Sequence, residues 1–335
     1  MHPSSLAERG TFVISLDFEL NWGVRDQQTL AQYGPNLLGV RPAVPAMLAL
    51  FAEFGLHVTW ATVGLLFFDQ RPDLLAHLPA VRPQYADPRL SPYEAIDQLG
   101  PSEAADPYHY GLSLLEQIRR VPGQEVGTHT FCHYYCLERG QTPEAFRHDL
   151  QAAVRIGQER GLPVRSLVFP RNQYNAAYLE ICRELGITSY RGNEQSWIYK
   201  ERSEEQQSLY KRGARLLDAY VNLSGQHCAT LAELAGTLPF NIPASRFLRP
   251  WSGRLRSLEG LRLRRILAGL EYAARHGRVF HLWWHPHNFG TNLPENMAVL
   301  RLIAGHYRLM QQRYGMASRT MSEVAEKLEE LRIKN

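Results

Sequence analysis

Two acidic side chains stand two residues apart at the end of the first apolar run of the chain. Residues 11–16 read TFVISL, a short run rich in β-forming residues, and Asp17 and Glu19 follow it. Because side chains two apart on an extended segment share a face, both carboxylates can converge on one centre, where one binds a metal and the other accepts a proton. The ordinary alternative is that such acids cap the next element or pair with a basic residue.

Two histidines spaced four residues apart offer imidazole ligands. On a helical turn, the spacing of His129 and His133 would place both rings on one side. Two imidazoles and a carboxylate, with one position open for water, make a catalytic zinc shell. HxxxH alone is a weak signal, and the neighbouring acids are what favour a metal over two hydrogen-bonded histidines. Cys132 and Cys136 repeat the spacing, so a closed Cys₂His₂ site is an alternative, but four ligands on adjacent turns cannot surround a metal tetrahedrally; we expect packed thiols.

Two later motifs carry further polar candidates. Arg171, in FPRNQ, has a planar guanidinium that could hold and acidify a catalytic aspartate, or form an ordinary strand-end ion pair. Residues 281–288 read HLWWHPHN, where strand alternation places the first and third residues and His285 on one face. His285 is therefore a candidate general acid; its alternative is a buried histidine satisfied by the backbone.

These candidates follow apolar segments that alternate with helical ones. The pattern predicts strands at 11–16, 56–63, 124–128, 166–169 and 279–284, and helices at 44–54, 143–161, 176–185, 259–276, 295–314 and 322–332. Strands alternating with helices predict an α/β fold with a parallel sheet, open or closed into a barrel. In both, sites form where strands end, and the candidates follow predicted strand ends: Asp17, Glu19, His129, Arg171 and His285.

The charge and the apolar content of the chain argue against some classes of function. Lys and Arg total 37 against 33 Asp and Glu, a formal charge of +4, and 44% of residues are hydrophobic. Basic residues are interspersed with acidic ones, which disfavours nucleic-acid binding. We find no signal peptide and no apolar run near the roughly 20 residues that span a bilayer. Four cysteines form no disulfide framework, so we expect a cytoplasmic protein.

The motifs together resemble the polysaccharide deacetylase family, which shares the NodB homology domain and corresponds to carbohydrate esterase family 4. The resemblance is carried in order by TFVISLDFE, MLALFAEFGLHVTWATVG, EVGTHTFCHYY and LVFPRNQYN, and by WWHPHN near the end. It covers residues 11–192 and 279–325. The acid pair, the HTxxH-type cluster and the WWHPHN segment are its most specific parts.

The resemblance implies a distorted (β/α) barrel of seven strands with insertions, a divalent metal, with zinc expected, and hydrolysis of an N-acyl group on a carbohydrate. By position, Asp17 would be the general base, Arg171 its partner and His285 the general acid. Glu19, His129 and His133 would bind the metal. The residues that would contact substrate are Trp22, Tyr134, Asn172, Trp283, His287 and Asn288. We expect a single barrel domain over residues 1–335, with a loop excursion at about 69–111 and a less legible insertion at about 193–258.

Several alternatives remain open within and beyond this family. Phe18 stands where the commoner motif has the second of two adjacent aspartates, and the third-ligand role passes to Glu19. Relatives with altered acids act without metal on cyclic amides or ureides, so a metal-independent hydrolase is one alternative. A barrel that binds a glycan without catalysis is another. Looser similarity to members associated with surface-polysaccharide synthesis suggests a nucleotide- or lipid-linked sugar as substrate.

Overall fold

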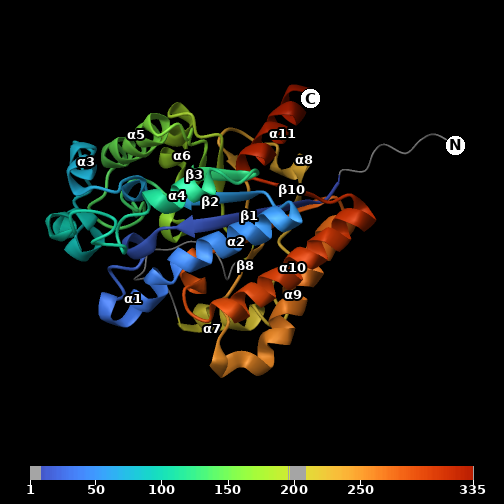
Figure 1. The fold of residues 1–335 in the computed structure, drawn as a ribbon. Helices are drawn as coiled ribbons and strands as arrows, with labels where there is room; N and C mark the ends of the chain where they lie inside the picture. The colour runs from blue at the N-terminus through green and yellow to red at the C-terminus, as the bar shows by residue number, and fades with distance from the viewer. Residues whose placement is uncertain (1–8, 195, 197–208, 335) are drawn as a thin grey trace.

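The first apolar run forms the central strand of a parallel sheet. The computed structural model describes residues 9–194, 196 and 209–334 (Figure 1). Strand β1 (Thr11–Phe18) pairs in parallel with β2 (Val58–Thr62) on one side and with β9 (Arg278–Trp284) on the other. The segments at the two ends of the sequence therefore meet at the centre of the sheet.

The sheet continues from β2 and returns to β9. Beyond β2 come β3 (Gln124–Thr128), β4 (Ser166–Val168), β5 (Ser189–Arg191) and β7 (Phe240–Asn241), while β8 (Arg246–Phe247) pairs with β9.

The segment from β7 to β8 closes the ring of strands. Backbone N–H groups of Ile242 and Ala244 donate to carbonyls beside β5, and those of Ser245 and Leu248 donate to carbonyls of β9. With β7–β8 counted as one strand, the ring β1, β2, β3, β4, β5, β7–β8 and β9 has seven strands. This confirms the predicted distorted (β/α) barrel. Two short strands lie outside the ring: β6 (Ala229–Thr230), antiparallel to β9, and β10 (Ala317–Arg319), beside β1.

Side-chain alternation along β1 separates an outer core from the barrel interior. Phe12, Ile14 and Leu16 point outward and pack in the larger apolar cluster. Val13 points inward and belongs to a smaller cluster inside the barrel. Asp17 shares the inward face of Val13, so β1 delivers this carboxylate to the end of the barrel where its strands terminate.

Helices cover the outside of the barrel. In Figure 1, α9 (Glu259–Arg275) and α10 (Leu293–Tyr314) run side by side on one flank, next to α2 (Val40–Phe54), and α5 (Pro143–Glu159) lies beside α6 (Ala176–Glu184) on another. Thr142 caps α5, because its side chain accepts a hydrogen bond from the N–H of Ala145. The other α-helices of the described residues are α1 (Leu30–Leu38), α3 (Arg71–Ala76), α4 (Leu112–Ile118), α7 (Leu209–Asp218), α8 (Leu231–Leu234) and α11 (Met321–Lys334).

Helix α11 closes the amino-terminal end of the barrel. The N–H of Met321 donates to the hydroxyl of Thr59 near the start of β2, and Val324 and Leu328 join the interior cluster with Val13. The opposite end, where the strands terminate, is the end that carries the candidate residues.

The two stretches without sequence periodicity contain short elements. Over 69–111 the chain forms α3 and the 3₁₀ turns η3 (Pro88–Leu90) and η4 (Pro92–Gln98). Within 193–258 the described residues form the elements from α7 to η7 (Gly253–Leu258), including the ring-closing segment. The charged run at 200–205 lies outside the described residues.

One segment is long and apolar enough to cross a bilayer by length and composition alone. It is Leu30–Phe54, which corresponds to α1 and α2, and half of its most apolar window is buried inside the fold. The two helices meet at Gly39, and Val44, Met47 and Phe51 of α2 pack in the outer core. A core helix passes the same test as a membrane span, and its packing here is that of a core helix.

Candidate active site

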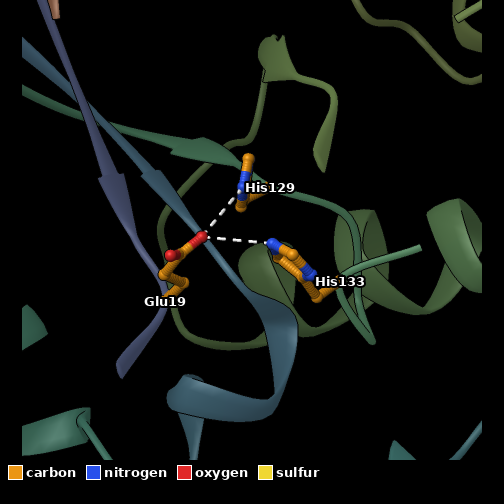
Figure 2. Close-up of side chains that lie close together, drawn as sticks. All are labelled: Glu19, His129 and His133. Carbon is orange, nitrogen blue, oxygen red and sulfur yellow. Dashed lines mark hydrogen bonds and ion pairs between the residues drawn. The ribbon is translucent and has the colours of Figure 1, made fainter. Parts of the chain in front are cut away.

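A carboxylate and two imidazoles meet just beyond the ends of β1 and β3. Oε2 of Glu19 lies 3.1 Å from Nε2 of His133 and 3.3 Å from Nε2 of His129. Figure 2 shows the carboxylate pointing toward both rings. All three side chains are buried. Their three ligand atoms lie within 4.8 Å of one another, so one ion could contact all three.

The expected helical turn at His129 and His133 is absent, which corrects the sequence prediction. Residues 129–136 form an irregular loop, in which Thr130 and His133 have left-handed backbones with φ of 64° and 61°. Both carboxylate oxygens of Asp149 accept N–H groups of this loop, from Phe131 at 2.7 Å and from the next residue at 3.1 Å. The two imidazoles therefore converge because the loop folds around a buried carboxylate, and burial raises the pKa of Asp149 to about 6.

The orientation of the two rings suits metal binding. Nδ1 of His129 lies 2.7 Å from the carbonyl oxygen of Val168 and donates to it, so Nε2 is directed at Glu19. Burial lowers the pKa of His133 to about 4, so that ring is neutral at neutral pH. Burial alone would raise the pKa of Glu19, but the nearby histidines outweigh it and hold that pKa well below its usual value. Two neutral imidazoles and a carboxylate are the donor set of a catalytic zinc site.

Arg191, which the sequence analysis did not select, holds Asp17. Nη1 and Nη2 of Arg191 lie 2.7 and 2.8 Å from Oδ1 and Oδ2 of Asp17, a bidentate pair buried on both sides. Burial raises the pKa of Asp17, but the Arg191 charge, together with His129 and His285, outweighs it and leaves that pKa below its usual value. Asp17 is therefore ionised at neutral pH.

Arg171, which we expected to hold Asp17, instead lines the cavity into which Asp17 faces. Its guanidinium pairs with Asp26 and lies 3.8 Å from Glu138, and its carbon stands 4.3 Å from the centre of the Tyr135 ring. Arg171 has a left-handed backbone, with φ of 53°, at the turn that follows β4. This turn directs its side chain toward the acids of neighbouring loops, so we correct the assignment of Arg171 as the partner of Asp17.

His285 faces both acids from the end of β9. Its Nε2 lies 3.6 Å from Oε1 of Glu19 and 3.7 Å from Oδ2 of Asp17, and its side chain is 24% exposed. It stacks on the buried ring of His287, with centroids 4.9 Å apart. Burial lowers the pKa of His287 to about 3, so the His287 ring is neutral at neutral pH.

These side chains line a cavity of about 260 Å³. The cavity collects residues from the ends of β1, β3, β4 and β9, as parallel strands of a barrel require. Its lining consists of Asp17, Glu19, Gly23, Gln27, His129, His133, Arg171, Asn172, Gln173, Trp283 and His285.

The residues expected to contact substrate divide into three groups. Asn172 and Trp283 line the cavity. His287 and Asn288 lie behind His285; Nδ2 of Asn288 is 3.5 Å from Nδ1 of His285.

Trp22 and Tyr134 are buried outside the cavity lining, which corrects their assignment. The indole N–H of Trp22 donates to the backbone carbonyl of His109. The hydroxyl of Tyr134 donates to the backbone carbonyl of Thr142. Gln27 lines the cavity although no motif singled it out, and so does Gln173, the last residue of FPRNQ, which the motif did not mark as a site residue.

The cysteines behave as packed thiols. Cys132 and Cys136 are fully buried, and none of Cys132, Cys136, Cys182 and Cys228 forms a disulfide. The buried cysteine beside His133 packs in the outer core rather than toward the cavity.

Comparison with known proteins supports the fold. No protein-family model matches the chain, and no curated protein matches it in sequence. A solved structure from Mycobacterium smegmatis, described as a polysaccharide deacetylase, matches with a TM-score of 0.60 at 16% identity, over 99% of this chain and 93% of that one. PuuE allantoinase matches with a TM-score of 0.55 at 10% identity, over 95% and 90%.

A third structure matches over a similar extent. A protein from Pseudomonas aeruginosa, also described as a polysaccharide deacetylase, has a TM-score of 0.52 at 11% identity, over 95% of this chain and 90% of that one. Identities this low show a shared fold and leave the chemistry to be argued from the site.

Proposed function

We propose that the protein is a carbon–nitrogen hydrolase that removes an N-acyl group, acetyl or formyl, from a carbohydrate with the help of a divalent metal. The observation that carries the proposal is the position of Glu19. Its Oε2 lies within 3.3 Å of two imidazole nitrogens, while its Oε1 lies 3.6 Å from His285. The site thus combines a ligand set with an acid and a base on the same side of the barrel.

Glu19, His129 and His133 would hold the metal, and zinc suits this donor set. A zinc ion held by these residues would supply Lewis-acid chemistry, namely activation of water and of the acyl oxygen. The proton of His129 on Nδ1, fixed by the Val168 carbonyl, keeps Nε2 directed at the site.

Asp17 and His285 carry the proton transfers in this proposal. Asp17 is ionised and lines the cavity, so it accepts a proton from the attacking water. The water oxygen bonds to the acyl carbon, the carbon–nitrogen bond breaks, and His285 gives a proton to the departing amine nitrogen. Arg191 keeps Asp17 in place through both carboxylate oxygens.

The size of the cavity and its lining suit one sugar unit. A volume of about 260 Å³ is at the small end of ligand sites, which favours a single acylated sugar over a long chain. Asn172, Gln173 and Gln27 give the lining a polar character that suits a hydroxylated ligand. A nucleotide- or lipid-linked sugar remains our suggestion for the substrate, and four cysteines that form no disulfide suit action in a reducing compartment.

The test is release of acetate or formate from a panel of N-acetylated and N-formylated sugars. We expect turnover with bound zinc, and Asp17→Asn should keep the metal and lose turnover because its amide accepts no proton. Full activity of Asp17→Asn, with metal content equal to that of the wild type, would remove Asp17 from its role.

A metal-independent cyclic amide hydrolase is the second candidate. It is favoured by the contact between Glu19 and His133, which at 3.1 Å is a hydrogen bond that needs no ion, and by the fold shared with an allantoinase. Unchanged turnover of a cyclic amide after complete chelation would select this candidate. A glycan that binds without forming product, in both the wild type and Asp17→Asn, would instead indicate a non-catalytic barrel.

A further inference from the structure

A polar layer lies inside the barrel, directly beneath Asp17. Ser15 on β1 and His281 on β9 are both fully buried, at 0% exposure, among strands whose inward positions usually carry branched apolar residues. Buried polar groups cost free energy unless they are hydrogen-bonded. The partners of these two side chains therefore indicate why they stand there.

The hydrogen bonds of the layer have a defined direction. Nδ1 of His281 lies 3.1 Å from the carbonyl oxygen of Ile242, which can only accept, so Nδ1 carries the proton and Nε2 is an acceptor. The hydroxyl of Ser15, 2.8 Å away, donates to that Nε2. The Ser15 oxygen then accepts from Nη1 of Arg191 at 3.0 Å. Because His281 takes the hydroxyl proton of Ser15, the lone pairs of the Ser15 oxygen are left facing Arg191.

Arg191 is held through both of its Nη atoms by this layer and its neighbours. In addition to both oxygens of Asp17, it donates to Ser15 from Nη1 and to Oδ1 of Asn172 from Nη2, at 3.0 Å each. The guanidinium carbon lies 4.1 Å from the centre of the Trp283 ring. Ser15 and Asn172 fix the rotation of the guanidinium in its plane, and the indole fixes the plane itself.

We propose that Ser15 and His281 are positioning residues, which orient Arg191 and through it hold Asp17 at the angle from which it takes a proton. The proposal rests on the function proposed above. Neither residue contacts the cavity. Their effect reaches the reaction only through the guanidinium, because Arg191 joins the layer to the carboxylate of Asp17.

Substitutions of Ser15 and His281 test the proposal. Ser15→Ala should lower kcat about tenfold, the effect expected when one hydrogen bond is lost. KM and bound metal should not change, since the cavity and the ligands are untouched. His281→Leu should lower kcat equally, while His281→Gln, whose Oε1 can accept near the place of Nε2, should recover most of that loss.

A double-mutant cycle separates positioning from general loss of stability. In an Arg191→Lys background, Ser15→Ala should have no further effect on kcat, because the guanidinium it orients is gone. Ser189→Ala is the matched control: its hydroxyl is fully buried on β5, two residues before Arg191, but it contacts Ser166. We expect its kcat to equal that of the wild type. Additive effects of Ser15→Ala and Arg191→Lys would overturn the proposal.

A second readout keeps this test independent of the proposed function. The Nη protons of Arg191, held by four acceptors, should exchange slowly and give separate NMR signals in the wild type and in Ser189→Ala, and should broaden in Ser15→Ala. If the wild type hydrolyses no acylated sugar, the proposed function fails while the NMR result still stands. Unchanged Arg191 signals in Ser15→Ala would overturn the positioning role in either case.

Discussion

At the scale of single residues, Arg191 distinguishes this site from the one the sequence suggested. FPRNQ was the natural place to look for a guanidinium, because it follows a predicted strand and precedes a helix. Arg191 ends a strand of only three residues, Ser189–Arg191, which is too short to show a periodicity. The signal that could have found Arg191 is its position. A predicted helix ends near Gly186, and Arg191 follows a few residues later, where the next strand of an alternating fold would end in a polar side chain.

Arg191→Lys should reduce turnover far more than a conservative change normally does. An ammonium group cannot bind both oxygens of Asp17 and also reach Ser15 and Asn172, so the carboxylate loses its fixed angle. We expect kcat to fall by about 10²-fold or more, with one metal per chain retained. Steady-state kinetics beside metal analysis measures this. Wild-type kcat in Arg191→Lys would show that the bidentate pair is dispensable.

At the scale of elements, the loop after β3 shows what residue spacing can and cannot predict. The sequence placed His129 and His133 together correctly, but by a helical turn that does not form. The actual approach depends on two left-handed residues and on Asp149, which belongs to α5 and lies sixteen positions beyond His133. Such a contact between elements leaves no local pattern in the sequence. The sequence could therefore predict that the two histidines belong together, but it could not predict the carboxylate that shapes their loop.

The buried Asp149 should make stability depend on pH in a defined direction. Its folded pKa of about 6 lies above the unfolded value of 3.8, so the fold favours the protonated carboxyl. Its stabilising contribution is therefore complete below the unfolded pKa and is lost as pH rises through about 6. Relative to Asp149→Asn, the wild-type free energy of unfolding should rise by up to about 3 kcal/mol as pH falls from 7.5 to 4. A difference between the two proteins that is flat over this range would contradict the assignment.

At the scale of the whole molecule, the sequence predicted the α/β barrel from alternating strands and helices and could not predict its closure. The closing segment consists of two strands of two residues each, Phe240–Asn241 and Arg246–Phe247, in a stretch without periodicity. Its hydrogen bonds go to strands far away in sequence, so only the assembled barrel gives them a partner.

A close approach between the two ends of the chain should also be sensitive to one methyl group. A Cβ at Gly290, just after the turn η8 (Pro286–Phe289), would lie 1.9 Å from the backbone oxygen of Asn36 in α1. Because backbone cannot yield as a flexible side chain does, Gly290→Ala should lower the free energy of unfolding by about 1–3 kcal/mol.

The matched control for that change is Gly305→Ala in the middle of α10, where nothing lies within 4 Å of the added carbon. That variant should be as stable as the wild type or slightly more stable, because alanine favours helix. Thermal or denaturant unfolding compares the three proteins. Equal losses in both variants would mean that the approach at Gly290 carries no strain.

The most direct test of the account is the metal content of the purified protein. Wild type and Asp17→Asn should each bind about one divalent ion per chain after loading with zinc and removal of excess, whereas a His129→Ala/His133→Ala double variant should bind none. Stoichiometric metal in the first two and its loss in the third would establish the centre formed by Glu19 and the two imidazoles. A wild-type protein that stays free of metal after loading would contradict it.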